Sequence, residues 1–252
     1  MPQVSIIVPM LNEATVIQRT LKHLSILDPP AQEILLVDGG STDATVDIAQ
    51  QYAASESPST PMTVMTLVNC GRALQMNQGA AIAMGDILCF LHADTLVPDD
   101  FVAVVTATLA QPHVICGGFI SLMGGAQTTR WGISDQNYLK TYLAALFCRP
   151  HLFFCKGLRV LFGDQAIFCQ RQAFWNCGGF DIHLPIMEDA DLCLRMIHYG
   201  RIRLVNRVVQ SSDRRLARWG SLKATAIYYG IGWLWAMGIP APWLKRFYED
   251  IR

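Results

Sequence analysis

Five polar side chains stand close after apolar, β-branched runs in the first half of this sequence. They are Asn12, Glu13, Asp38, His92 and Asp94. Side chains of these types accept hydrogen bonds from the hydroxyl and amide groups of a ligand. Carboxylates also hold divalent cations and remove protons from reacting groups. Because the five residues are far apart in the sequence, they can act together only if the fold brings them to one place.

The runs that precede them alternate with helical patterns. Short buried strands are predicted at residues 4–8, 34–37, 62–68 and 87–91, and helices at 13–27, 41–52, 74–84 and 98–109. This order predicts an α/β fold with a mostly parallel central sheet that helices flank on both faces. Ligands bind such sheets at the carboxyl ends of the strands, so we expect the five side chains to gather at that edge.

The second half of the chain has a less regular pattern. Strands are predicted at residues 116–123 and 166–169, helices at 130–154 and 188–199, and a turn at 178–179. Residues 224–244 hold no charged side chain but contain three glycines and two prolines. That composition favours a buried or interfacial helix ending near Gly238 over a membrane span. The basic residues before this segment and the aromatic residues within it suit a membrane surface.

The composition excludes several classes of protein. Hydrophobic residues make up 52% of the chain and charged residues 16%, which predicts a folded protein. Twenty basic and 20 acidic side chains balance, so no general attraction to nucleic acid is expected. The eight cysteines include no C-x-x-C pair, which indicates buried thiols in a reducing compartment rather than a zinc site. Without a signal-peptide pattern, we expect a cytoplasmic protein, free or at the inner face of the plasma membrane.

Four segments together resemble the family 2 glycosyltransferases of GT-A fold. They are residues 4–13 (VSIIVPMLNE), 34–43 (ILLVDGGSTD), 85–94 (GDILCFLHAD), and 178–180 with 187–189 (GGF and MED). The resemblance implies a GT-A, nucleotide-diphospho-sugar transferase domain over residues 1–212. Its nucleotide-binding half would be residues 1–115 and its acceptor half 116–212. A basic and aromatic helical segment, residues 213–252, would pack on the domain or lie at a membrane surface.

A narrower resemblance concerns His92-Ala93-Asp94, Gly163-Asp164-Gln165 and residues 211–215. These segments look like a bacterial subfamily of arsenosugar-biosynthesis and carotenoid-acid glycosyltransferases. The resemblance implies an enzyme that transfers a hexose with inversion from a nucleotide sugar, with UDP as the expected nucleotide. The acceptor would be a small or lipid-like molecule. A processive polymerase is not expected, because no transmembrane bundle is predicted to carry a growing polymer.

The resemblance assigns the donor nucleotide to residues of the first half. Pro9, Asn12 and Glu13 would line the nucleoside pocket, where Glu13 accepts from ribose hydroxyls. Asp38 would accept a hydrogen bond from the base, and Arg72 would reach phosphate oxygens. Plainer alternatives stay open: Glu13 as a carboxylate that favours a helix start, Asp38 as a turn residue, and Arg72 as a solvated side chain.

Asp94 closes what is an Asp-x-Asp metal motif in the family, and His92 stands in place of the first aspartate. The resemblance implies a divalent cation, Mn²⁺ or Mg²⁺, held by Asp94 and His92 to neutralise the departing diphosphate. Histidine is a better ligand for Mn²⁺ than for Mg²⁺. Two other roles for His92 stay open, a hydrogen bond to ribose or diphosphate and a place in the core.

The acceptor side is assigned in the same way. Asp189 would be the general base and Glu188 its orienting or neutralising neighbour, with a plain acidic helix start as the alternative. Contacts with the acceptor or the diphosphate are expected from Asp164, Gln165, Arg215, Arg218 and Trp219. The last three resemble the Q-x-x-R-W motif of processive family members, with arginine for glutamine. A basic stretch that faces a membrane explains those three equally well.

Two rival functions are weighed against the transferase. The first is a non-catalytic nucleotide-sugar-binding protein with a degenerate metal motif, which the intact Asp94, Glu188 and Asp189 argue against. The second is a methyltransferase, suggested by a strand that ends in VDGG. It would need a G-x-G-x-G loop, which residues 38–42 do not supply.

Overall fold

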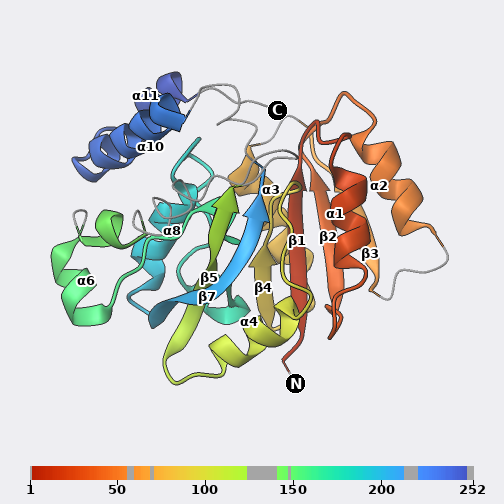
Figure 1. The fold of residues 1–252 in the computed structure, drawn as a ribbon, viewed down its shortest axis with the longest axis horizontal. Helices are drawn as coiled ribbons and strands as arrows, with labels where there is room; N and C mark the ends of the chain where they lie inside the picture. The colour runs from red at the N-terminus through yellow and green to blue at the C-terminus, as the bar shows by residue number, and fades with distance from the viewer. Residues whose placement is uncertain are drawn as a thin grey trace.

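A seven-stranded sheet forms the centre of the molecule (Figure 1). The computed structural model describes residues 2–55, 60–68, 71–123, 141–146, 149–212 and 221–248. The strands are β1 (Val4–Met10), β2 (Glu33–Asp38), β3 (Met62–Thr66), β4 (Ile87–Phe90), β5 (Val114–Met123), β6 (Ile167–Gln170) and β7 (Arg201–Ser211). Their order across the sheet is β3-β2-β1-β4-β6-β5-β7.

The sheet is mostly parallel, as predicted. Strands β3, β2, β1 and β4 run parallel to one another, and β7 runs parallel to β5. Strand β6 is antiparallel to both β4 and β5, so it joins the two halves. Helices cover both faces, which confirms the predicted α/β class. These helices are α1 (Ile17–Leu24), α2 (Thr45–Ala53), α3 (Arg72–Ile82), α4 (Phe101–Leu109), α6 (Pro150–Lys156), α7 (Arg171–Asn176) and α8 (Glu188–Met196).

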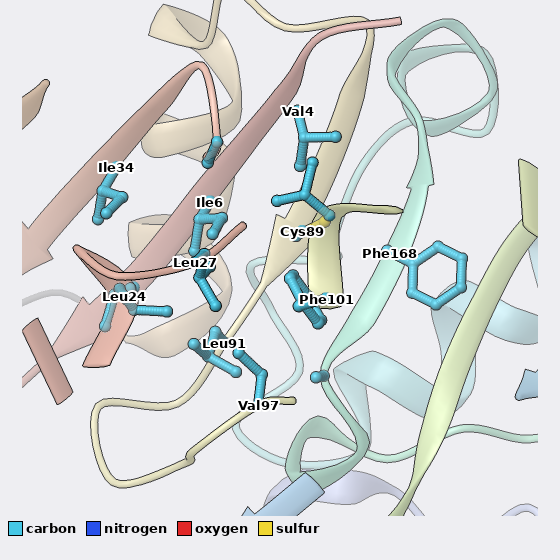
Figure 2. Close-up of a cluster of buried hydrophobic side chains, with 14 of the residues drawn as sticks. Val4, Ile6, Leu24, Leu27, Ile34, Cys89, Leu91, Val97, Phe101 and Phe168 are labelled. Atoms are coloured by element: carbon cyan, nitrogen blue, oxygen red, sulfur yellow. The ribbon is translucent and has the colours of Figure 1, made fainter. Parts of the chain in front are cut away.

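Successive residues of β1 face opposite sides of the sheet, which gives the protein two cores. Ile6 and Val8 pack with α1 and α4 on one side, whereas Ile7 packs with α3 on the other. Figure 2 shows the first core, where Leu24 of α1 and Phe101 of α4 lie over the strands. Because both faces are covered, β1, β2 and β4 read as continuous apolar runs, and this is why the sequence predicts them well.

The second half departs from the sequence prediction in two places. The helix predicted over 130–154 is not continuous, since residues 141–146 are helical and a separate helix, α6, begins at Pro150. Proline restricts the residue before it and suits the first turn of a helix. Residues 130–140 and 147–148 lie outside the described ranges. Strand β7 and helix α7 were not predicted, and β7 adds an edge to the sheet beside β5.

The C-terminal segment forms α10 (Ser221–Ala236), α11 (Ala241–Leu244) and a single 3₁₀ turn, η2 (Lys245–Phe247). The predicted break near Gly238 is present, and that glycine has a φ of 90°. Ile231 of α10 and Leu244 of α11 pack against Ile186, which lies just before α8. None of the helices within the described ranges combines the length and apolarity that a membrane crossing requires.

Candidate functional site

The carboxyl ends of β1, β2 and β4 carry the five polar side chains singled out in the sequence. These three strands are parallel neighbours, with Met10 of β1 in register with Asp38 of β2. The N–H of Gly39 donates to the carbonyl of Met10 over 2.9 Å, and that of Leu91 donates to Ile7 over 2.9 Å. The topology therefore brings the loops after β1, β2 and β4 to one edge, as the sequence predicts.

Asp38 is fully buried and organises the loop after β2. Its Oδ2 accepts from the N–H groups of Gly40 (2.9 Å) and Ser41 (3.0 Å), and its Oδ1 accepts from the Ser41 hydroxyl at 2.5 Å. These are the contacts of a turn aspartate. Each carboxylate oxygen has two lone pairs, so Oδ1 could accept one further hydrogen bond. The role of Asp38 toward the donor stays a prediction.

The loops after β1 and β2 are tied together by side chains. Asn12, whose φ of 55° is left-handed, accepts from the N–H of Thr42 through Oδ1 at 2.8 Å. Its own N–H donates to the Ser41 hydroxyl at 2.9 Å, and the N–H of Glu13 donates to Oγ1 of Thr45 at 2.7 Å. These bonds fix one wall of the site, with Pro9, Asn12 and Glu13 partly exposed on it.

A second wall of the site lines a small cavity, about 250 Å³ including open solvent, to which four elements contribute polar groups. Arg72 begins α3, His92 follows β4, and Gly163 begins the 3₁₀ turn η1 (Gly163–Gln165). Glu188 and Asp189 form the first turn of α8. The structure thus places the predicted general base beside two of the predicted donor-binding side chains.

An ion pair between Arg72 and Glu188 spans this cavity. Nε and Nη2 of Arg72 lie 2.6 Å and 2.5 Å from Oε1 of Glu188, whose side chain is 2% exposed. Burial lowers the pKa of Arg72, but the charges of Glu188 and Asp189 outweigh that effect and raise it. The other oxygen of Glu188, Oε2, is buried and has no hydrogen-bond partner among the described residues.

His92 faces the same guanidinium. Its Nε2 lies 3.1 Å from Nη1 of Arg72. A guanidinium only donates hydrogen bonds, so Nε2 is the acceptor and the proton of the neutral ring lies on Nδ1. Gly163 packs against the ring, because a Cβ added there would lie 2.5 Å from Nε2. The sequence prediction did not assign a role to Gly163, although it lies in the G-D-Q segment that the resemblance singled out.

Asp189 is buried but retains hydrogen-bonding capacity. Its Oδ2 accepts from the N–H of Gly163 at 2.6 Å, and its Oδ1 accepts from the N–H of Ala190 at 2.8 Å. Burial and the charge of Glu188 raise the pKa of this carboxyl to about 6, against the lowering effect of Arg72. Each oxygen keeps a lone pair, so Asp189 can still take a proton.

The backbone before Asp189 is held in an uncommon conformation. Met187 has a φ of 67° and Ala166, just after η1, a φ of 48°. Left-handed conformations cost non-glycine residues about 1 kcal/mol or more and are found where the surrounding structure demands them, often at functional sites. Both segments that meet at Asp189 therefore carry strain.

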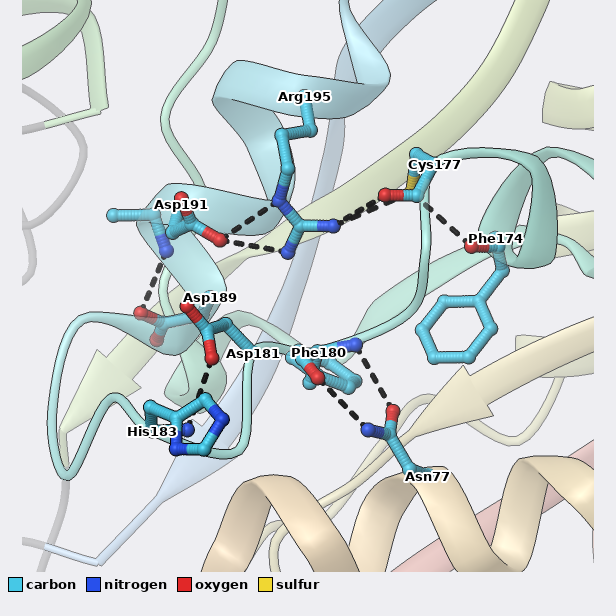
Figure 3. A network of polar contacts seen from close by, with 10 residues as sticks. Asn77, Phe174, Cys177, Phe180, Asp181, His183, Asp189, Asp191 and Arg195 are labelled. Carbon is cyan, nitrogen blue, oxygen red and sulfur yellow. Dashed lines mark hydrogen bonds and ion pairs between the residues drawn. The ribbon is translucent and has the colours of Figure 1, made fainter.

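Side chains of Arg195 and Asn77 fasten α8 and the segment before it to their surroundings (Figure 3). Arg195 donates from Nε to Asp191 at 2.8 Å and from Nη1 to the carbonyl of Cys177 at 2.6 Å. Asn77 of α3 exchanges two hydrogen bonds with the backbone of Phe180. Asp191 thus has a structural role, and its side chain points away from that of Asp189, as predicted from their spacing in the helix.

Other predicted acceptor residues are placed differently. Gln165 is a core residue, because its Nε2 binds the Phe119 carbonyl and the Thr141 hydroxyl while its Oε1 accepts from the N–H of Phe162. It therefore braces the turn in this structure, and the expected contact of Gln165 with a ligand stays a prediction. Asp164 is partly exposed, and its carbonyl accepts from the Ser211 hydroxyl at 3.1 Å. The predictions for Arg215, Arg218 and Trp219 lie outside the described residues.

Comparison with known proteins decides the family. The model of glycosyl transferase family 2 matches residues 5–170, which is more than half of the chain. The chain belongs to glycosyl transferase family 2. The match includes the loops after β1, β2 and β4, together with η1, and confirms the family that the sequence motifs predict. The Glu188–Asp189 pair lies beyond the matched segment.

Two known proteins match nearly the whole chain, one in sequence and one in structure. A PGL/p-HBAD biosynthesis glycosyltransferase of Mycobacterium bovis is 28% identical over 229 residues, which are 90% of this chain and 81% of that protein. The mannosyltransferase PcManGT of Pyrobaculum calidifontis, solved with GDP-Man and Mn²⁺, superposes with a TM-score of 0.72 at 21% identity. That superposition covers 99% of this chain and 65% of the mannosyltransferase chain.

A third comparison, of structure alone, is with glucosyl-3-phosphoglycerate synthase of Mycobacterium tuberculosis, solved with Mn²⁺, UDP and glucosyl-3-phosphoglycerate. It has a TM-score of 0.61 at 20% identity over 95% of this chain and 81% of that chain. These solved neighbours confirm the predicted GT-A fold. The enzyme class predicted from the sequence, a transferase, is likewise confirmed.

Replacing Arg72 with methionine is expected to destabilise this family 2 protein through Glu188. A buried carboxylate left without its partner costs 3–5 kcal/mol in fully buried pairs. The side chain of Arg72 is 36% exposed, so we expect a smaller loss of about 2 kcal/mol in the free energy of unfolding. Urea unfolding measures it. The double variant Arg72→Met/Glu188→Gln should recover at least half of the loss, whereas purely additive effects would contradict the ion pair.

Proposed function

We propose that this chain is an inverting hexosyltransferase that uses a nucleotide-sugar donor, with Asp189 as its general base. The observation that carries the proposal is the Asp189 carboxyl, buried beside Arg72 and His92, with a pKa raised to about 6. In the reaction, Asp189 takes the proton of an acceptor hydroxyl while the oxygen of that hydroxyl attacks the anomeric carbon of the donor sugar. The bond from that carbon to the diphosphate oxygen breaks, and the diphosphate leaves from the opposite face.

The donor side of the proposal rests on the loop edge and on the solved neighbours. Asp38, Asn12 and Glu13 lie where the nucleoside would bind, and the neighbours were solved with GDP-Man or UDP. Arg72 begins a helix, where both the guanidinium and the helix N-terminus favour a phosphate. UDP is the nucleotide we propose for this chain.

A divalent cation fits the site in a restricted way. Among the described residues, no three His, Cys, Asp or Glu side chains come close enough to hold a metal ion. Cations of nucleotide sites need few protein ligands, because substrate phosphates supply the rest. We therefore assign the cation to Asp94 together with the donor diphosphate, whose negative charge it would neutralise.

His92 suits the diphosphate better than the cation in this arrangement. Its Nε2 accepts from a guanidinium, and that positive charge disfavours a cation at the same nitrogen. With its proton on Nδ1, the ring holds Nη1 of Arg72 in place beside the leaving group. We therefore propose for His92 a role that the sequence did not suggest, the positioning of Arg72 against the diphosphate.

A nucleotide-sugar hydrolysis panel tests the proposed function without knowledge of the acceptor. The purified chain is incubated with UDP-, GDP- and dTDP-hexoses, with Mn²⁺ or with EDTA, and the released nucleoside diphosphate is measured. We expect slow release from UDP-hexoses that needs the cation. Donor binding without any release would favour the non-catalytic binding protein. A thermal-shift assay compares UDP plus Mn²⁺ with S-adenosylmethionine, and a rise in melting temperature with S-adenosylmethionine alone would contradict the glycosyltransferase proposal.

The pH dependence of turnover follows from the raised pKa of Asp189. A general base works only when ionised, so kcat should fall about tenfold per pH unit below about pH 6. An aspartate of ordinary pKa, 3.8, would stay ionised throughout that range. The measurement is the release rate at saturating donor between about pH 5 and about pH 8. A flat profile across that range would exclude Asp189 as the base.

A further inference from the structure

An apolar cavity lies next to the proposed base. It encloses about 550 Å³, part of it open to solvent, between α10 and the segments around Phe162 and Met187. Aromatic rings dominate its lining, with Tyr228, Tyr229, Trp233 and Trp235 on α10. Among the described residues that line it, none carries a charge. The cavity is therefore an apolar, partly open recess beside α10.

The apolar cavity adjoins the smaller cavity beside Asp189 along two stretches of backbone. Met187 lines the cavity, and the next two residues are Glu188 and Asp189. Phe162 also lines it, and the next residue, Gly163, donates its N–H to Asp189 at 2.6 Å. Consecutive Cα atoms are about 3.8 Å apart. A molecule that occupied the cavity could therefore hold a hydroxyl within reach of the Asp189 carboxylate.

The sequence keeps this space open at Gly232. This residue lies inside α10 and lines the cavity, and a Cβ added to it would meet nothing within 4 Å. Glycine inside a helix costs about 1 kcal/mol relative to alanine. A side chain at this position would project into the empty volume. The glycine thus preserves a cavity that a larger residue would fill.

From these features we infer that the cavity binds the apolar body of the acceptor, and that the acceptor is a neutral, largely apolar alcohol. The inference rests on the proposed function and names its acceptor class. Aromatic walls stack well on an aryl or alkyl body. Sugars and phosphorylated acceptors need charged or densely polar walls, because unpaired polar groups are costly to bury. The described lining does not offer such walls.

The test is direct binding of 2-naphthol, followed by its fluorescence, to the full chain and to two matched variants. Gly232→Leu places a side chain in the cavity. Gly230→Leu makes the same change two residues earlier in α10, at a glycine that also has free space but does not line the cavity. We expect saturable binding to the parent chain and to Gly230→Leu, and at least tenfold weaker binding to Gly232→Leu. Thermal unfolding checks that both variants fold.

Equal binding of 2-naphthol to all three proteins would overturn the inference. That result is what we would expect if α10 served only to dock the protein on a membrane. Binding is measured without donor, so it stays interpretable even if the hydrolysis panel contradicts the proposed function. With donor present, 2-naphthol should be glycosylated in preference to glucose and to 3-phosphoglycerate. Preference for either polar acceptor would overturn the acceptor class and leave the transferase proposal intact.

Discussion

An Asp189→Asn variant is expected to lose transfer activity by a factor of about 10² to 10⁴ while it retains donor affinity. Asparagine has nearly the same shape, and its oxygen can still accept one of the two hydrogen bonds from Gly163 and Ala190. It has no basic carboxylate, so the acceptor proton has nowhere to go as the new bond forms. The effect should therefore fall on kcat, with little change in the affinity for UDP.

A neighbouring aspartate supplies the matched control. Asp191 lies in the same helical turn and carries the same charge, but it pairs with Arg195 away from the cavity. Asp191→Asn should keep the transfer rate within a few-fold and affect mainly stability. The rates of both variants are compared at saturating donor, and UDP affinity is measured by titration. If the affinity for UDP collapses in Asp189→Asn, Asp189 holds the donor site together and is not the base.

The first half of the fold was accessible from the sequence because its strands are buried on both faces. Residues 34–37, for example, form a continuous apolar run that lies inside β2 and is followed at once by Asp38. The parallel order then fixes which strand ends meet, and with them one wall of the site. In this half of the chain the local sequence pattern and the strand order of the sheet agree, so the pattern alone predicts where the polar loops lie.

Strand β7 was not predicted because it is not buried on both faces. It lies at the edge of the sheet, and arginines at 201, 203 and 207 alternate with or interrupt its apolar residues. A bulged, half-exposed strand of this kind gives a weak periodic signal. The alternation of Arg201, Ile202, Arg203 and Leu204 was nevertheless a usable indication of a strand.

The second wall of the site, around Glu188 and Asp189, depends on contacts that no local sequence pattern reveals. Arg72 and Glu188 are 116 residues apart, and their ion pair exists only because the fold brings the first residues of α3 and α8 together. Gln165 shows the same limit, since its motif suggested a ligand contact and its packing makes it a brace for the turn. Motifs located the candidate residues, whereas tertiary packing decided which of them face the cavity.

An Asp94→Ala variant should lose both metal-dependent UDP binding and turnover. The cation that we assign to Asp94 and the diphosphate supplies several kcal/mol of charge stabilisation, so the rate should fall on the order of 10³-fold. UDP titrations with Mn²⁺ and with EDTA measure the binding. In the parent chain the cation should strengthen UDP binding, and in the variant the two titrations should coincide. Unchanged turnover would refute the assignment.

Two further variants make that experiment specific. Asp86 precedes β4, at the opposite end of the strand from Asp94, and its exposed carboxylate accepts a hydrogen bond from the backbone N–H of Gln3. Asp86→Ala should keep the full response to Mn²⁺. His92→Ala separates the two roles of the histidine: loss of the Mn²⁺ response would make it a metal ligand, whereas weaker UDP binding with the response intact is expected if it positions Arg72. The electrostatics favour the second result, because a nitrogen that already faces a guanidinium is a poor place for a dication.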